Sequence, residues 1–158
     1  MDFSRAGDEE GIRAEIERLR EKRCLSDREA AAVDAQAIGK LFSSPLGRRM
    51  LAAEKITREF KFSLLCPAGE LLGAASEDKL LLQGVVDCLL EENGELTVID
   101  YKTDAVRTEE QLRERTALYT PQLQTYAAAC ERIFGLKVKE CILYFLSMGR
   151  EARVEIKK

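Results

Sequence analysis

Two aspartates and a lysine that flank a short turn are the residues of this sequence best suited to chemistry. Asp87 precedes Asn93-Gly94, and Asp100 and Lys102 follow it. Asn-Gly between two apolar segments predicts a two-residue hairpin turn, and counting outward from that turn places Asp87 opposite Asp100. Because side chains alternate along a strand, Lys102 lies on the same face as Asp100.

Two facing carboxylates predict a bound cation. Their Cβ atoms would be about 4.5 to 5.5 Å apart, an arrangement in which like charges repel, and the apolar residues beside them add a desolvation cost. Mg²⁺, with Mn²⁺ as a substitute, is commonly held by one or two carboxylates and suits phosphodiester hydrolysis. Lys102 could orient the attacking water or neutralise charge on the phosphate. The spacing alone leaves open a simpler interpretation, in which Asp100 and Lys102 form an edge ion pair and Asp87 points to solvent.

The residues that are missing exclude several other chemistries. The chain has no histidine, so it cannot form a Ser-His or Cys-His nucleophile pair or a His-ligated metal site by itself. Its five cysteines have no C-x-x-C spacing and lie among apolar neighbours, which indicates reduced, buried thiols in a cytoplasmic protein. The sequence has no G-x-x-x-x-G-K-[ST] loop, so no ATP-driven motor is expected within it.

Length, composition and charge indicate one globular domain. A chain of 158 residues with 46% hydrophobic and 34% charged residues can bury one sizeable core. No apolar run is long enough for a membrane span, and the acidic first ten residues do not form a secretory signal. The net charge of −3 argues mildly against a stand-alone nucleic-acid binder. One basic stretch is interpreted as a solvated face: Arg48, Arg49, Lys55, Arg58 and Lys61.

The pattern of apolar residues predicts helices first and a sheet afterwards. Residues 1–57 are expected to form a helical segment packed on a core of residues 58–158. Its helices are predicted at 13–23, at 30–41 behind a capping box of Ser26 and Glu29, and at 46–53 behind Pro45. Strands are predicted at 58–64, 79–91, 95–102, 138–147 and 153–156, and helices at 108–117 and 120–134. Residues 66–69 are expected to end the first strand and to lead into a loop that reaches Asp78. This order predicts an α/β (α+β) fold with a mixed central sheet flanked by helices.

Three sequence blocks together resemble a known nuclease family. They are Gly84-Val85-Val86-Asp87, then Val98-Ile99-Asp100-Tyr101-Lys102-Thr103, then Tyr119-x-x-Gln122-Leu123-x-x-Tyr126-Ala127. In this order they resemble the RecB-like branch of the PD-(D/E)xK nucleases, which have a restriction-endonuclease-like core. Residues 42–47, 58–62 and 143–147 are similar to the C-terminal nuclease domain of the AddA subunits of bacterial helicase–nucleases. The resemblance covers roughly residues 10–156.

The resemblance implies a role for each matching residue. Asp87, Asp100 and the backbone carbonyl of Tyr101 would be the metal ligands, and Lys102 the catalytic lysine. The other implied site residues are Glu59, which would help to organise the metal and its water, and Gln122 and Tyr126 of the Q-x-x-x-Y element, which Tyr119 could join. From the residues alone, Glu59 could also be an exposed strand residue and Tyr126 an ordinary core residue.

The resemblance also implies a function and partners. The chain would be a magnesium-dependent DNA exonuclease domain that acts on single-stranded ends in double-strand-break processing and recombinational repair. A helicase part of the same parent chain and a second helicase–nuclease subunit would be its partners. The family's upstream metal-ligating histidine has no match here, so the chain is expected to be a C-terminal fragment with an incomplete, weakly active metal site. The alternative is an inactive nuclease-like fold that binds DNA or another protein of the assembly.

Overall fold

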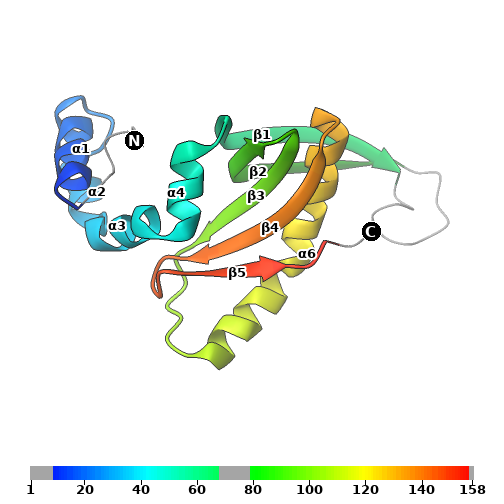
Figure 1. Cartoon of the computed structure of the whole chain (residues 1–158). Helices are drawn as coiled ribbons and strands as arrows, with labels where there is room; N and C mark the ends of the chain where they lie inside the picture. The colour runs from blue at the N-terminus through cyan, green and yellow to red at the C-terminus, as the bar shows by residue number, and fades with distance from the viewer. Residues whose placement is uncertain (1–8, 68–78, 157–158) are drawn as a thin grey trace.

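A five-stranded sheet with helices on both faces forms the protein (Figure 1). The computed structural model describes residues 9–67 and 79–156. The helices are α1 (Glu9–Glu21), α2 (Asp27–Ala32), α3 (Ala35–Ser43), α4 (Pro45–Ala52) and α6 (Glu109–Phe134). The strands are β1 (Lys55–Pro67), β2 (Lys79–Glu92), β3 (Glu95–Lys102), β4 (Lys137–Phe145) and β5 (Arg150–Val154).

The sheet is mixed, as the sequence predicts. Its strands lie in the order β1-β2-β3-β4-β5, and every neighbouring pair is antiparallel except β3 and β4, which are parallel. A parallel connection needs a crossover, and α6 provides it between β3 and β4. The fold is therefore α/β, and the prediction of a mixed sheet flanked by helices is confirmed.

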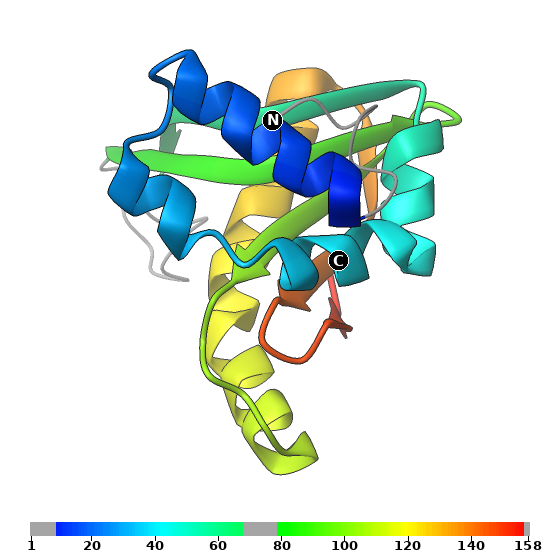
Figure 2. The ribbon, with the colours of Figure 1, turned by 90° about the vertical axis from the view of Figure 1, so that its left-hand side faces the viewer.

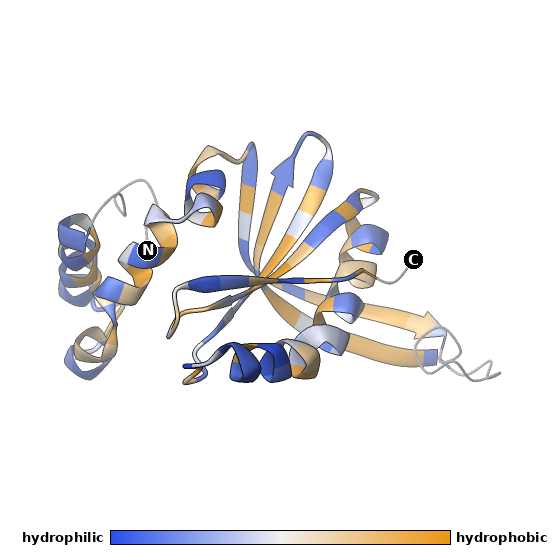
Figure 3. Cartoon of the chain, turned by 60° about the horizontal axis from the view of Figure 1, so that its bottom comes forward, coloured by the Kyte–Doolittle hydropathy of each residue, from blue (hydrophilic) through white to orange (hydrophobic). Residues whose placement is uncertain are grey.

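The core has one half on each face of the sheet. On one face, α6 packs through Leu123, Ala127 and Cys130 against strand residues that include Val98 and Phe145. On the other face, residues of α1, α3 and α4 pack with Cys88, Leu90, Ile99 and Ile142. Figure 2 shows the N-terminal helices in front of the strands and α6 behind them. The middle parts of the central strands are mostly hydrophobic, because both of their faces are covered there, and hydrophilic residues lie nearer the strand ends (Figure 3).

The hairpin between β2 and β3 has the predicted register. Asn93 and Gly94 both have positive φ, 54° and 72°, as a type I′ turn requires. Glu92 pairs with Glu95, and the same register continues as far as Cys88 and Ile99. The turn thus fixes which β2 and β3 side chains share a face of the sheet.

The predicted helix at 30–41 is wrong in its bounds, because the chain makes two helices there. The capping box of Ser26 and Glu29 is present, but it opens α2, which ends at Ala32. Asp34 then accepts a hydrogen bond from the Ala37 backbone N–H and begins α3. An aspartate at this position satisfies the free N–H groups of a new helix, which favours a break over a continuous helix.

The prediction of two helices at 108–117 and 120–134 is also wrong, because α6 runs through Pro121 as a single helix of 26 residues. Proline removes one intrahelical hydrogen bond. The apolar contacts of α6 with the sheet compensate for that loss, because packing of an amphipathic face supplies most helical stability in proteins. Gly135 ends the helix with φ 67°, as a left-handed C-cap.

Several smaller expectations are corrected. Cys24 is exposed, although the other four cysteines are buried as predicted. Arg49 is not part of a solvated face, because its guanidinium bridges Glu92 and Glu140 at 2.7 and 2.5 Å. Strand β1 begins and ends beyond the predicted 58–64, and β5 begins three residues before the predicted 153–156. The strand end expected from Cys66 onward lies at Pro67, and the rest of the expected loop, 68–78, lies outside the described residues.

Among the described residues, none of the helices has both the length and the apolar character needed to cross a membrane.

Candidate active site

The two aspartates lie where β2 and β3 separate. The ladder between these strands ends at Cys88 and Ile99, one pair before Asp87 and Asp100 would meet. Beyond that point β2 continues beside β1 only, while β3 continues beside β4 as far as Lys102. The register predicted from the sequence is therefore correct, and it places Asp87 opposite Asp100. The backbones of these two residues do not pair with each other, however. Both carboxylates therefore lie at the end of the β2–β3 ladder.

Beyond the end of the ladder, the backbone N–H of Tyr101 on β3 has no partner on the backbone of β2, and the Asp87 carboxylate accepts its hydrogen bond instead. Its Oδ2 accepts a hydrogen bond of 2.9 Å from the backbone N–H of Tyr101. Because the N–H and C=O of one strand residue point to the same side, the Tyr101 carbonyl also points toward the gap. The next carbonyl, that of Lys102, points the other way and accepts from the Leu146 N–H at 2.9 Å. Half-buried Asp87 is therefore tied to β3, and it does not point freely to solvent.

Asp100 is a buried acid beside a lysine. Its side chain is close to fully covered, with the residue 5% exposed. Lys102 Nζ lies 2.6 Å from Oδ2 in an ion pair. Burial raises the pKa of the Asp100 carboxyl, the hydrogen bond and the charge of Lys102 oppose this rise, and the charge of Asp87 adds to it.

Lys102 is surrounded by polar and aromatic side chains of α6. Its Nζ donates to Gln122 Oε1 at 3.3 Å, and it lies 3.8 Å from the centre of the Tyr119 ring. Gln122 Nε2 donates in turn to the Tyr126 hydroxyl at 3.2 Å. Residues 119, 122 and 126 are three and four apart, so they share one face of the helix. The structure thus brings the Q-x-x-x-Y residues to Lys102, as expected from the sequence.

Tyr126 serves both as a core residue and as a neighbour of the site. Its ring meets Phe62 edge to face, with the ring centres 5.4 Å apart, while its hydroxyl accepts from Gln122. The two interpretations of Tyr126 that the sequence left open are therefore compatible.

Glu59 is not gathered with the two aspartates. Arg58 pairs with Cys88 and Phe60 with Val86, so Glu59 is level with Asp87 on the neighbouring strand. It is exposed, however, and its φ is positive, at 51°, within the continuous strand β1. A positive φ is uncommon in a residue other than glycine, and strain of this kind often occurs at functional sites. Glu59 is thus an exposed strand residue, and its role at the metal stays a prediction.

The donors at the gap fit a hard divalent cation. No group of three or more acidic, cysteine or histidine side chains that could hold a metal occurs in 9–67 and 79–156. Mg²⁺ does not require one, since it binds through one or two carboxylates and keeps several waters. The Asp87 and Asp100 carboxylates and the Tyr101 carbonyl would meet that need, and the Asp100 carboxylate already attracts a cation, the Lys102 ammonium at 2.6 Å. The fit therefore rests on two acids and a carbonyl.

Asp104 is a residue near the site to which the sequence analysis assigned no chemistry. Both oxygens of its carboxylate accept from the Tyr119 hydroxyl at 3.1 Å, and Arg115 lies 3.6 Å away on the same helix as Tyr119. This contact joins a loop to a helix, so neither strand alternation nor helical spacing signals it. Its one sequence signal is its position two residues after Lys102.

Gly84 leaves the space that Tyr126 occupies, and Tyr126 in turn contacts Gln122 beside Lys102. A Cβ at this position would lie 2.7 Å from Tyr126 Cε1 and 2.8 Å from two atoms of the Phe62 ring. We predict that Gly84→Ala displaces Tyr126, lowers the free energy of unfolding by about 1 to 3 kcal/mol, and weakens the Gln122 contact to Lys102. Thermal melts measure the first effect and cleavage assays the second.

Gly39→Ala is the matched control for Gly84→Ala. Its new Cβ would lie 3.7 Å from Ile12 Cδ1, an ordinary contact, and alanine favours a helix by about 1 kcal/mol over glycine. Gly39→Ala should therefore be as stable as the parent chain or more so. Equal melting temperatures for Gly84→Ala and the parent would contradict the close packing at Gly84.

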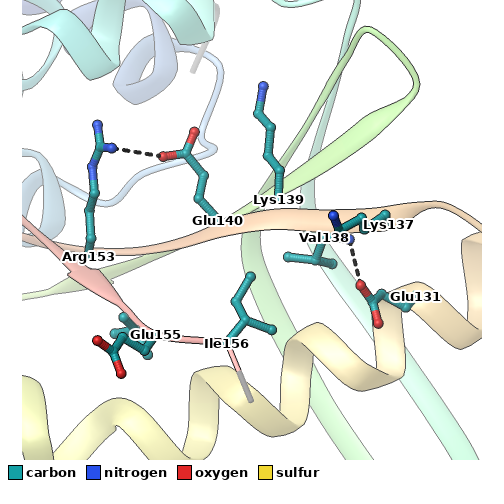
Figure 4. A pocket seen from close by; sticks show the side chains of 9 residues that line it. Glu131, Lys137, Val138, Lys139, Glu140, Arg153, Glu155 and Ile156 are labelled. Atoms are coloured by element: carbon teal, nitrogen blue, oxygen red, sulfur yellow. Dashed lines mark hydrogen bonds and ion pairs between the residues drawn. The ribbon is translucent and has the colours of Figure 1, made fainter. Parts of the chain in front are cut away.

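A hollow beside β4 and β5 is distinct from the gap that holds the aspartates (Figure 4). It lies at the opposite end of β4 from Leu143, the partner of Asp100. Two of its acidic groups have partners, since Glu140 pairs with Arg153 at 3.8 Å and Glu131 accepts from the Val138 N–H at 2.8 Å. The hollow therefore lacks the facing carboxylates that single out the strand gap.

A comparison with known protein families identifies the family of the chain. Residues 3–157 match the PD-(D/E)XK nuclease superfamily, and the chain belongs to this family. A mixed sheet with two aspartates and a lysine at the parting of two strands agrees with that membership.

The sequence is also similar to one component of bacterial helicase–nucleases. It is 42% identical to an ATP-dependent helicase/nuclease subunit of Geobacillus thermodenitrificans over 91% of this chain and 12% of that protein. The proteins of the same name from Acetivibrio thermocellus and Alkaliphilus oremlandii are 41% and 38% identical, over 95% and 98% of this chain. The chain spans only 12 to 13% of the length of these three relatives.

Proposed function

We propose that this chain is a magnesium-dependent DNA nuclease domain that hydrolyses phosphodiester bonds within a larger helicase–nuclease. The observation that carries the proposal is the buried Asp100 carboxylate beside Asp87 and Lys102, at the point where β2 and β3 separate. Burying a charge is costly unless it is compensated. A fold that places a second carboxylate next to such a buried charge is arranged to receive a cation.

Each residue of the site has a defined task in this proposal. Asp87, Asp100 and the Tyr101 carbonyl would hold Mg²⁺, with Mn²⁺ as a substitute. When bound, the ion supplies Lewis-acid activation of the phosphate and of a water. The Lys102 ammonium would orient the attacking water or stabilise the negative charge that develops on the phosphate. Gln122 and Tyr126 would keep that ammonium in place from α6, and Glu59 would help to organise the water.

The name of the relatives supports a proposal for the substrate and the partners of this domain. Their name combines an ATP-dependent helicase with a nuclease. We infer that this domain cuts single-stranded DNA ends, as an exonuclease, after a helicase part of the same parent chain has separated the strands. A second helicase–nuclease subunit would be the further partner, and processing of double-strand breaks for recombinational repair would be the process served.

Cleavage of labelled DNA by the purified chain tests the proposal. In millimolar Mg²⁺ or Mn²⁺ we expect shortening of single-stranded DNA, and no shortening in EDTA. Asp100→Ala removes a proposed ligand and should abolish the reaction, because the remaining donors are too few to hold the ion in place.

Two other outcomes separate this proposal from its alternative. DNA binding without cleavage, equal in the parent chain and in Asp100→Ala, would favour a nuclease-like fold used for binding. Cleavage at equal rates in the two proteins would show that Asp100 is not a ligand of the active ion.

A further inference from the structure

If the proposed function is correct, the ion pair with Asp100 is not sufficient to hold the Lys102 side chain in place. A lysine carries its charge on a flexible four-carbon stem with several rotatable bonds. Its closest contact is with Asp100, at 2.6 Å, and that carboxylate is also the proposed metal ligand. Once Asp100 shares its charge with a metal, its attraction for Lys102 weakens. The other contacts of Lys102 must then hold the ammonium.

The Tyr119 ring is the largest of these contacts. Lys102 Nζ lies 3.8 Å from the ring centre, well within the range in which an ammonium is attracted to an aromatic face. Only 14% of the lysine side chain is exposed, so water competes weakly for the charge. The contact to Gln122 Oε1, at 3.3 Å, adds one hydrogen bond on the same helix face.

The Tyr119 ring is itself fixed from the far side. Its hydroxyl donates to the Asp104 carboxylate, with both oxygens at 3.1 Å. A hydrogen bond to a charged acceptor is stronger than one to a neutral acceptor. It also increases the electron density of the ring, and therefore its attraction for a cation.

Asp104 is held by the turn between β4 and β5. Its backbone carbonyl accepts from Ser147 Oγ at 2.6 Å and from the Val106 N–H at 2.9 Å. Val106 N–H also donates to Ser147 Oγ at 3.2 Å. The loop after β3 is thus held against the β4–β5 turn, and the backbone that carries the Asp104 side chain is fixed.

We propose that Tyr119 and Asp104 are positioning residues for Lys102. Tyr119 presents its ring to the ammonium, and Asp104 fixes and polarises that ring through the phenol hydroxyl. The proposal rests on the proposed function in one respect, namely that Lys102 acts in phosphodiester cleavage. The position of Lys102 against the ring is a property of the chain itself and can be measured without DNA or metal.

A purely structural role is the rival explanation of the Tyr119 contacts. The hydroxyl–carboxylate bond could serve only to tie α6 to the loop after β3. In that case the Lys102 ammonium would be indifferent to the ring, and loss of the bond would change stability alone. The two explanations differ in what they predict for the environment of Lys102.

NMR spectroscopy of the lysine side chains separates these explanations. The ring current of Tyr119 should move the Lys102 Cε–H signal upfield of the signals of exposed lysines, with or without Mg²⁺. The signal is assigned by its absence in Lys102→Arg. In Tyr119→Leu it should return to the position of an exposed lysine, whereas in Tyr119→Phe and Asp104→Asn it should stay upfield by a smaller amount.

Cleavage kinetics give the second readout. Tyr119→Leu should lower kcat roughly tenfold while KM changes less than about twofold, because the lysine acts on the reacting phosphate and not on DNA binding. Tyr119→Phe keeps the ring and should recover most of that loss. Arg150→Gln is the matched control, because Arg150 ties the start of α6 to β5 through Glu109 without touching Lys102. It should leave both the signal and kcat unchanged.

Three results would overturn the positioning role. They are a Lys102 signal among those of exposed lysines in the parent chain, an unchanged signal in Tyr119→Leu, and a parent-like kcat in Tyr119→Leu. Absence of cleavage in the parent chain would instead reject the proposed function. In that case the NMR result alone decides whether Tyr119 positions Lys102.

Discussion

Replacing Lys102 with alanine is expected to lower the rate of DNA cleavage by about 10² to 10³-fold, the loss typical of removing one group that stabilises charge in a transition state. Metal affinity should persist or increase, because Lys102 lies 2.6 Å from Asp100 Oδ2 and competes with a cation for that oxygen. A single substitution would thus separate cleavage from metal binding. Single-turnover cleavage measures the first property, and calorimetric titration with Mg²⁺ the second.

Lys139→Ala is the matched control for Lys102→Ala. Lys139 is also a strand lysine in an ion pair, 3.0 Å from Glu92, with 27% of its side chain exposed. It lies on β4, away from the strand gap, so its loss should leave cleavage at the parent rate. A Lys102→Ala protein that cuts as fast as the parent chain would contradict the catalytic assignment of Lys102.

The position of the acids was predictable from the sequence because local rules determine it. Asn93-Gly94 sets the hairpin turn, and strand alternation then determines which residues share a face. The structure confirms that register as far as Cys88 and Ile99. The separation of β2 from β3 beyond this pair was not predictable, because β2 pairs with both β1 and β3 and no local pattern tells where one partner is lost.

Helix boundaries were predicted less well, for a related reason. Pro121 suggested the start of a second helix because proline is favoured in the first turn, but the packing of α6 on the sheet keeps one helix continuous through it. The contact of Asp104 with Tyr119 joins residues 15 positions apart, from a loop and a helix. Only the assembled fold brings such residues together, so periodicity within either segment carries no information about the pair.

The structure changes the argument for repulsion between the two acids. From the sequence, Asp87 and Asp100 face each other without compensation. In the fold, Asp87 accepts from the Tyr101 N–H and Asp100 pairs with Lys102. The pKa of Asp100 is nevertheless raised, because desolvation outweighs the charge of Lys102. The charged form of Asp100 is therefore a net cost to the metal-free protein.

Asp100→Asn is consequently expected to make the metal-free protein more stable than the parent chain, by about 0.5 to 1 kcal/mol. Asparagine keeps the volume of aspartate and removes the buried charge. In saturating Mg²⁺ the order should reverse. Metal at 100 times its dissociation constant stabilises the parent by about 2.7 kcal/mol, and the variant should lose this gain because a ligand is missing.

The advantage of Asp100→Asn without metal should depend on pH. A group whose pKa is higher in the folded protein binds its proton more tightly there, so folding is most favoured when that group is protonated. Parent stability should therefore fall as pH rises from about 3.9, the ordinary value of an aspartic acid, through the raised pKa of Asp100. Below this pH range Asp100→Asn should be as stable as the parent, and above it the variant should be more stable than the parent.

Thermal and urea melts of both proteins, at several pH values and with and without Mg²⁺, measure these effects together. Glu140→Gln is the control, because Glu140 is an ion-paired acid on β4 that bonds Arg49 at 2.5 Å, away from the proposed metal. This variant should lose stability without metal and keep the full shift with metal, the opposite of Asp100→Asn in both respects. If Asp100→Asn is instead less stable than the parent and still responds to Mg²⁺, then the Asp100–Lys102 pair is a stabilising ion pair and the cation binds elsewhere.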